Sequence, residues 1–135
     1  MGYPTKISTA HHSDSAVATA GTAKDQYVGH GMRGKFTPVK ARFMPDTTAA
    51  ADATNYATIA LKDRAGSPAT LGSITSASTA LTAGTQRELT LTGNTTSAEC
   101  DEDEFLLWST TKAGTGAVVN GTLYVEWERV PGDTF

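Results

Sequence analysis

The stretch that decides the fold lies near the C-terminus and reads Val118-Val119-Asn120-Gly121-Thr122-Leu123-Tyr124-Val125-Glu126-Trp127-Glu128. Its second half alternates, because Leu123, Val125 and Trp127 fall on one face and more polar residues fall on the other. Such alternation is typical of a strand in an antiparallel sheet with one face in the core. Since Asn and Gly tolerate the positive φ of a type I′ turn, we expect residues 115–119 and 122–130 to form a closing hairpin.

Working back along the chain, the same period of two recurs between turn-forming residues. The expected further strands are 39–45, 56–62, 70–76, 87–92 and 105–108, the last apolar on both faces and therefore central. Residues 46–55 are expected to form a loop or one short helical turn. About seven short strands at this spacing predict an all-β fold, an antiparallel β-sandwich or jelly-roll-like domain over residues 36–135.

Residues 1–35 differ in composition from the rest of the chain. They are rich in Ala, Ser, Thr, Gly and His, and neither the helical nor the strand period is sustained. We therefore expect an extended N-terminal arm that cannot form a core of its own and lies against another part of a larger assembly. The residues expected to contact a partner are Tyr3, Ile7, Tyr27, Met32, Arg33 and Lys35.

Length and charge limit the possible functions. A chain of 135 residues fits one domain, and a formal net charge of −3 argues against nucleic-acid binding. Arg33, Lys35, Lys40 and Arg42 do lie close together in the sequence. The favoured interpretation is a solvated strand edge, and the alternative is a docking stripe for an acidic partner.

Cysteine content and hydropathy bear on the compartment. The single Cys100 excludes an intrachain disulfide framework, and its acidic neighbours Glu99 and Asp101 should disfavour a nucleophilic thiolate. No apolar run approaches the roughly 20 residues of a membrane span, and no secretion signal is evident. We expect synthesis in a reducing cytoplasm and no membrane partner.

Two clusters could hold a metal ion. The acidic run 99–104 offers carboxylates for Ca²⁺ but lacks EF-hand spacing. The favoured interpretation is a solvated loop whose charges oppose aggregation of the buried strand that follows. His11 and His12 point opposite ways in an extended chain, and neither they nor His30 have further ligands at matching spacing. The sequence therefore predicts no metal site and no cofactor.

Two patterns resemble catalytic or nucleotide-binding motifs. Ser13, Asp14 and Ser15 lie beside the histidines, but proximity in sequence does not make a catalytic triad. Residues 29–34, Gly-His-Gly-Met-Arg-Gly, match a dinucleotide fingerprint without its strand and helix, so a flexible joint is favoured. We expect no catalytic residues and no enzymatic activity.

Two segments carry a resemblance to a known class of proteins. Ala41-Arg42-Phe43-Met44-Pro45-Asp46 with the later 53–59, and Leu106 to Gly116 before a Val-rich strand, are similar to virion proteins that coat the capsid of tailed bacteriophages. The resemblance covers about residues 39–128 and looks like a head decoration, or cement, protein. It implies a homotrimer on the outside of an icosahedral shell, bound to the major capsid protein and bridging capsomers. It implies no active site.

An adhesive module of a phage fibre or spike, binding a carbohydrate or a receptor, is the alternative function. Sugar-binding sandwiches display exposed aromatic side chains for stacking. Tyr3, Tyr27, Tyr56 and Tyr124 are available here, but they are spread over distant segments.

Overall fold

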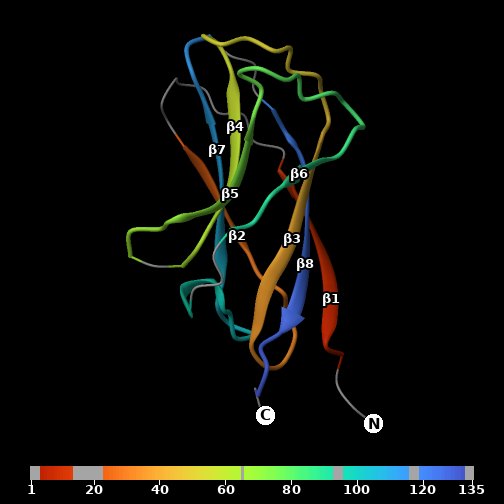
Figure 1. The fold of residues 1–135 in the computed structure, drawn as a ribbon, viewed down its shortest axis with the longest axis vertical. Coiled ribbons are helices and arrows are strands. Elements are labelled where there is room, and N and C mark those ends of the chain that lie inside the picture. Colours follow the sequence, from red (N-terminus) through yellow and green to blue (C-terminus); the bar gives the residue numbers. More distant parts are fainter. Residues whose placement is uncertain (1–3, 14–22, 65, 93–95, 116–118, 133–135) are drawn as a thin grey trace.

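Two four-stranded antiparallel sheets pack against each other as a β-sandwich, as expected (Figure 1). The structure, a computed structural model, describes residues 4–13, 23–64, 66–92, 96–115 and 119–132. The strands in this part of the chain are β1 (Lys6–Ser13), β2 (Lys24–Val28), β3 (Phe36–Pro45), β4 (Ala57–Lys62), β5 (Thr70–Thr75), β6 (Arg87–Leu89), β7 (Leu106–Lys112) and β8 (Gly121–Arg129). A short 3₁₀ helix, η1 (Thr96–Ala98), lies between β6 and β7.

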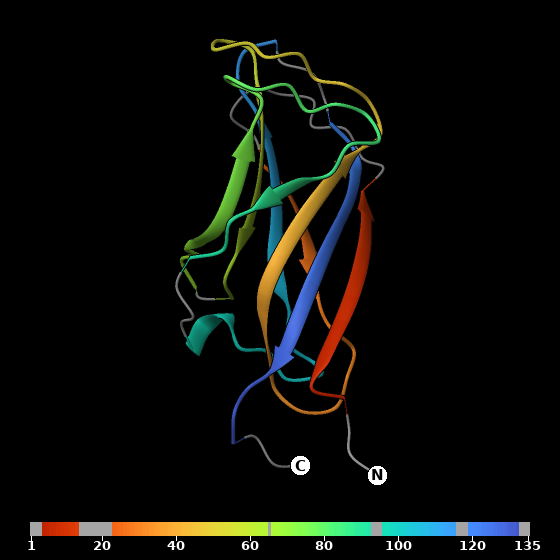
Figure 2. The same ribbon diagram turned by 45° about the vertical axis from the view of Figure 1, so that its right-hand side comes forward.

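The chain passes repeatedly from one sheet to the other. One sheet has the order β1-β8-β3-β6 and the other β2-β7-β4-β5. Figure 2 shows β1, β8 and β3 side by side in the first sheet on the right, with the second sheet, which contains β7, β4 and β5, to their left. Within the described residues only β4 and β5 are both consecutive and paired. Most of the pairing is therefore between segments far apart in the sequence.

Strand β8 confirms the alternation that predicted it. Leu123, Val125 and Trp127 are fully buried, while Glu126 is half-buried and Glu128 exposed. β8 pairs with β1 on one side and with β3 on the other, so it lies inside its sheet. Because such a strand packs on one face only, its apolar side chains lie on the core face and its polar side chains on the other.

The expected closing hairpin is wrong. β7 and β8 lie in different sheets, and neither Thr115 nor Val119 belongs to a strand; residues 116–118 lie outside the described residues. Gly121 has no positive φ and is the first residue of β8. A Cβ there would lie 2.6 Å from the ring of Phe43 and would also meet the carbonyl oxygen of Met44. This glycine permits a close approach of strands instead of forming a type I′ turn.

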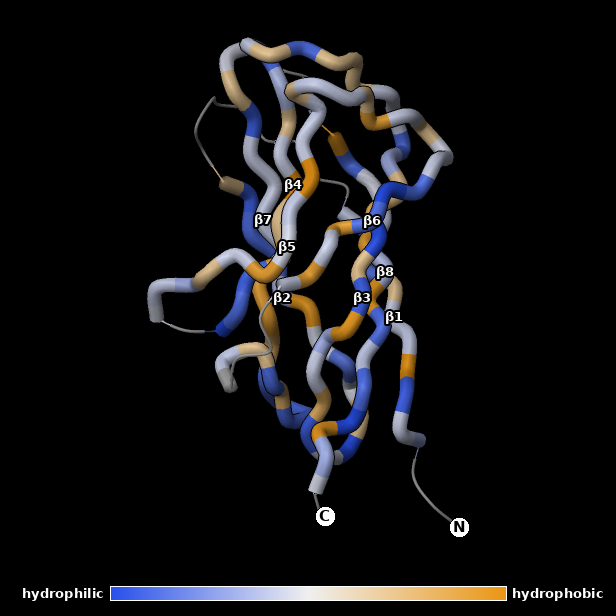
Figure 3. The backbone as a smooth tube through the Cα atoms, viewed as in Figure 1, coloured by the Kyte–Doolittle hydropathy of each residue, from blue (hydrophilic) through white to orange (hydrophobic). Residues whose placement is uncertain are grey.

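The core fills the space between the sheets. Its largest fully buried side chains are Trp108, Trp127, Phe36, Phe43, Ile59, Leu61, Leu81, Leu89, Leu106 and Leu123. Phe43 meets Trp108 edge to face with 5.9 Å between ring centroids, so an aromatic contact joins β3 to β7 across the sandwich. Hydrophobic residues recur along strands of both sheets in Figure 3. β7 is central, as expected from its apolar start at Leu106.

A bulge changes the expected face of one residue. The period of two over residues 39–45 would place Val39 on the buried face with Ala41 and Phe43, but it is 44% exposed. The register of β3 against β8 shifts between Pro38 and Lys40, which leaves two successive residues facing outward. An extra residue of this kind turns the side chains that precede it to the opposite face.

The N-terminal segment is part of the sandwich. Eight residue pairs join β1 to β8, and five join β2 to β7, so the two strands form one edge of each sheet. This corrects the expected arm: the composition changes near residue 35, but the sheets do not end there. The backbone pairing of an edge strand needs few apolar side chains, and Val28 alone in these two strands is a buried hydrophobic residue.

The segment between β3 and β4 is a loop. The Asp52 carboxylate accepts hydrogen bonds from the backbone N–H groups of Thr54 and Asn55, and these bonds hold its pKa below the usual value. Asn55 in turn accepts a hydrogen bond from the Thr115 N–H at 2.9 Å, which ties this loop to the segment after β7. Within the described residues no helix is long and apolar enough to cross a membrane.

Candidate docking surface

The two outward faces of the sandwich differ in chemistry. Register places the outward side chains of β1, β8, β3 and β6 in rows across the first sheet. The charged members of this outer face are Lys6, Lys40, Arg42, Glu88, Glu126 and Glu128. Arg42 and Glu126 form an ion pair at 3.4 Å, with both side chains partly exposed. This face is a mixed-charge, solvated surface.

The outer face of the second sheet consists mainly of small residues. Pairing of β7 with β4 and of β4 with β5 brings together Thr58, Ala60, Ser73, Thr75, Ser109 and Thr111. We call these six residues the small-residue face. Ser109 and Ala60 are buried in the middle, while the four others are half-buried or exposed. A surface with neither long nor charged side chains can lie close against another protein with little side-chain entropy to lose.

An exposed aromatic pair adjoins this face, and we call it the aromatic corner. Tyr27 on β2 is 74% exposed, and Phe105, just before β7, is 47% exposed. Their rings meet edge to face with 6.1 Å between centroids. Gly29 makes room for this contact, because a Cβ there would lie 2.7 Å from the Phe105 ring. Leu107, opposite Tyr27 in the ladder, extends the apolar surface toward the small-residue face.

Acidic side chains flank the aromatic corner. Asp25 is exposed and lies on the same face of β2 as Tyr27, two residues away. Glu102 and Asp103 are exposed in the turn before Phe105, which the Glu104 N–H closes by donating to the Asp101 carbonyl at 3.1 Å. Glu104 is paired with Arg64 at 3.1 Å. The surroundings of the corner are therefore acidic.

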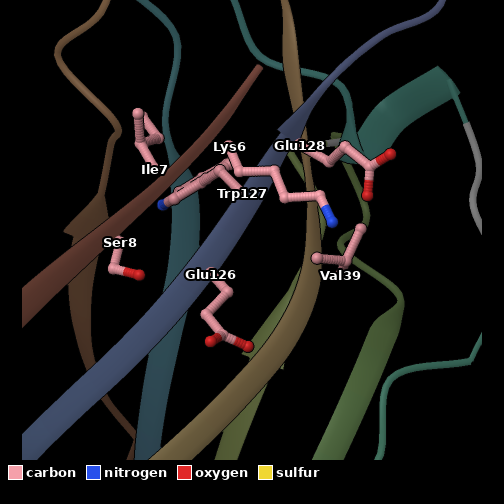
Figure 4. Close-up of a pocket in the computed structure, with 7 residues that line it drawn as sticks. All are labelled: Lys6, Ile7, Ser8, Val39, Glu126, Trp127 and Glu128. Atoms are coloured by element: carbon pink, nitrogen blue, oxygen red, sulfur yellow. The ribbon is translucent and has the colours of Figure 1, made fainter. Parts of the chain in front are cut away.

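A shallow hollow lies on the opposite, charged face. It has a volume of about 280 Å³ and is lined by Lys6, Ile7, Ser8, Val39, Glu126, Trp127 and Glu128. In Figure 4 the Lys6 side chain extends across β8 toward Val39, the residue that the bulge turns outward. The hollow is small and is lined by charges of both signs.

The six residues expected to contact a partner do not form one surface. Tyr27 lies in the aromatic corner, whereas Ile7 and Met32 pack partly buried against the core. Arg33 is exposed in the turn before β3, and its carbonyl accepts a hydrogen bond from Arg129. Lys35 is half-buried beside it, with its carbonyl bonded to the Val130 N–H. Tyr3 lies outside the described residues.

The basic cluster expected around residues 33–42 is likewise divided. Lys40 and Arg42 lie on the charged outer face of the first sheet, and Arg42 is paired with Glu126. Arg33 and Lys35 precede β3.

The sequence did not predict the contact between Tyr27 and Phe105 in the aromatic corner. Phe105 was expected to lie within a central strand, whereas it lies just before β7.

The three histidines occupy separate structural sites. His30 is buried, its Nδ1 accepts from the Met32 N–H at 3.0 Å, and its Nε2 therefore donates to the Cys100 carbonyl at 2.7 Å. His12 contacts the Asp46 carboxylate at 2.9 Å. The pKa of His11 is lowered by partial burial, and its Nε2 is hydrogen-bonded to the Thr9 hydroxyl at 2.9 Å. Thr9 also accepts from the Trp127 indole N–H at 2.9 Å.

Cys100 is a structural residue. Its side chain is buried, and its backbone bridges to Phe36 through two hydrogen bonds of 2.8 and 2.9 Å. Burial, with a smaller effect from Glu104, raises the pKa of its thiol to about 12. The sequence predicted the direction of this shift from the acidic neighbours but missed burial, which is the larger cause.

The motifs considered in the sequence do not come together as a reactive site within the described part of the chain. In those residues no group of three or more His, Cys, Asp or Glu side chains could hold a metal ion. Gly31 and Gly34 have positive φ values of 67° and 99°, which suits the turn that leads into β3. Of the Ser13–Ser15 motif only Ser13, which is buried, lies within the described residues.

Comparison with known proteins gives no match to any protein-family model, any curated protein or any solved structure.

Proposed function

We propose that this chain is a virion structural protein that binds the outside of an icosahedral phage capsid and stabilises it by bridging capsomers. The observation that carries the proposal is the small-residue face, six short side chains on the outward side of β4, β5 and β7. The likeness of residues 39–128 to head decoration proteins supplies the identity of the partner, the major capsid protein.

The physical demands of such a role fit the molecule. A stable protein interface buries about 1,200–2,000 Å² in total, and it depends on shape complementarity more than on reactive groups. The Thr, Ser and Ala side chains of the small-residue face can contribute to that area without themselves burying a charge. The opposite face, with charges of both signs, suits exposure to water.

We further propose that the protein acts as a homotrimer that presents three such faces to the shell. Simultaneous attachment of the three copies would strengthen binding by about 10²–10⁴ over a single copy. Light scattering of the free protein, with its stoichiometry on particles, tests this point. A monomer both in solution and at isolated sites on the shell would contradict it.

The test of capsid binding uses two matched substitutions. Thr58→Arg places a long cation on the small-residue face, and Thr122→Arg places the same cation on the outer face of β8, where Thr122 is equally half-buried. Shells of the parent phage that lack this protein are incubated with each variant and sedimented. We expect Thr58→Arg to lose most shell binding and Thr122→Arg to keep it. Equal binding by the two variants would refute the assignment of the face.

The aromatic corner gives the adhesive alternative one favourable observation. Tyr27 and Phe105 together offer an exposed aromatic surface, as sugar-binding sites do. Tyr56 and Tyr124, by contrast, are half-buried on other segments and do not join it. A glycan array with free protein tests adhesion, and binding to assembled shells without glycan binding favours the structural role.

A further inference from the structure

We infer that the aromatic corner is an anchor for a basic, partly apolar segment of the partner protein, whose Arg or Lys side chains reach over Tyr27 and pair with the surrounding carboxylates. This deepens the proposed function, on which it rests, by naming the chemistry that the shell must present at this point.

The aromatic pair is the first part of the argument. Among the described residues the exposed large hydrophobic side chains are Tyr27, Val39 and Phe105, and two of these three are in contact. Water contact with so much aromatic surface is unfavourable, and grouped exposed aromatics commonly mark interaction sites. Rigid aromatic side chains of this kind are also the usual energetic centres of interfaces.

The position of the pair is fixed by the fold. Tyr27 is held by the pairing of β2 with β7, and Phe105 crosses the backbone at Gly29 because that residue has no Cβ. The backbone positions of both residues are therefore set by the fold before any partner arrives, which lowers the conformational entropy lost on binding.

Charge determines the chemistry of the partner. Asp25 lies two residues from Tyr27 on the same face of β2, and Glu102 and Asp103 lie in the turn before Phe105. All three are exposed, and none forms an ion pair within the described residues. Lys62 lies in line with Leu107 and Tyr27 across the sheet, and Arg64 is already paired with Glu104. An acidic or phosphorylated partner would be repelled, whereas a guanidinium can stack on the tyrosine face and reach a carboxylate.

The first experiment measures binding of the full chain to a short synthetic peptide that alternates arginine and leucine, with a glutamate–leucine peptide as the control. We expect the basic peptide to bind and the acidic one not to bind. Tyr27→Ser and Phe105→Ser should each weaken binding about tenfold. Asp103→Asn should weaken it about threefold, and raising the salt from about 50 to 500 mM should weaken it further.

Matched controls lie on the opposite sheet. Val39→Ser removes an apolar side chain as exposed as Phe105, and Glu88→Gln removes an exposed carboxylate of β6. Both should leave peptide binding unchanged. Equal binding of the acidic peptide, or an equal loss in Val39→Ser, would overturn the inference. The inference would also be overturned if the protein bound a glycan through Tyr27 and did not bind the basic peptide.

A second readout separates this inference from the proposed function. If the protein binds shells but Tyr27→Ser and Phe105→Ser bind them as tightly as the wild type, the anchor is wrong and the capsid role stands. If shells are not bound but the basic peptide is bound through Tyr27, the capsid role is wrong and the anchor stands.

Discussion

Deleting residues 2–30 should abolish cooperative folding of the remainder, because β1 and β2 complete both sheets. The deletion removes Val28, whose full burial stabilises the fold by about 1.5–3 kcal/mol. It also removes the Thr9 hydroxyl that accepts from the Trp127 indole, a bond with a net value of about 1 kcal/mol. Loss of His30 opens a cavity beside Phe36 and Trp127, at a cost of about 2–5 kcal/mol.

These losses are of the order of 5–9 kcal/mol before any backbone pairing is counted, and a domain of this kind is stable by about 5–15 kcal/mol. Urea unfolding followed by tryptophan fluorescence and circular dichroism is the assay, with the full-length Ser8→Ala variant as the control. Ser8 is exposed on β1, so that change should stay within about 0.5 kcal/mol of the wild type. A truncated chain that unfolds cooperatively within about 2 kcal/mol of the full-length protein would refute the reasoning and restore residues 1–35 as a separable arm.

Four other outcomes follow from individual sites. Trp127→Ala should cost about 3–5 kcal/mol in urea unfolding, and a near-wild-type midpoint would mean that the side chain is not in the core. Gly121→Ala should cost about 1–3 kcal/mol because its methyl group meets Phe43, whereas no effect would indicate free space at the start of β8. The raised Cys100 pKa favours the folded state until the unfolded thiol ionises near pH 9.0, so the free energy of unfolding should fall between pH 9 and about 12. It should fall less in Cys100→Ala, and equal slopes would contradict this. The lowered His11 pKa should make stability fall below pH 6.5, less so in His11→Gln, and NMR titration of the ring checks the direction.

The sequence was sufficient for the fold class because alternation is a local signal. Leu123, Val125 and Trp127 are buried as their spacing predicted, and so are Ala57, Ile59 and Leu61 in β4. The pairing of these strands could not be predicted in the same way. Consecutive strands mostly lie in different sheets. Asn120-Gly121 indicated a hairpin, but β8 pairs with β3 and not with β7, the strand before it in the sequence.

The N-terminal strands were missed for a physical reason. β1 reads Lys-Ile-Ser-Thr-Ala-His-His-Ser, with polar side chains even on its inward face. Thr9 and His11 are accommodated there because they hydrogen-bond to each other and Thr9 also binds the Trp127 indole. A pattern of apolar residues in the sequence cannot predict such hydrogen bonds between distant polar side chains. The aromatic corner depended likewise on Gly29 and Phe105, which lie 76 positions apart in the sequence and meet only in the fold.

Cryo-electron microscopy of the parent particle carrying this protein tests the central claim most directly. The account predicts density for a β-sandwich on the outer surface of the shell, with the small-residue face and the aromatic corner against the capsid protein and the charged face of β1, β8 and β3 toward solvent. Density at the tip of a fibre or spike, or a sandwich seated on the shell by its charged face with Thr58 and Tyr27 in solvent, would contradict it.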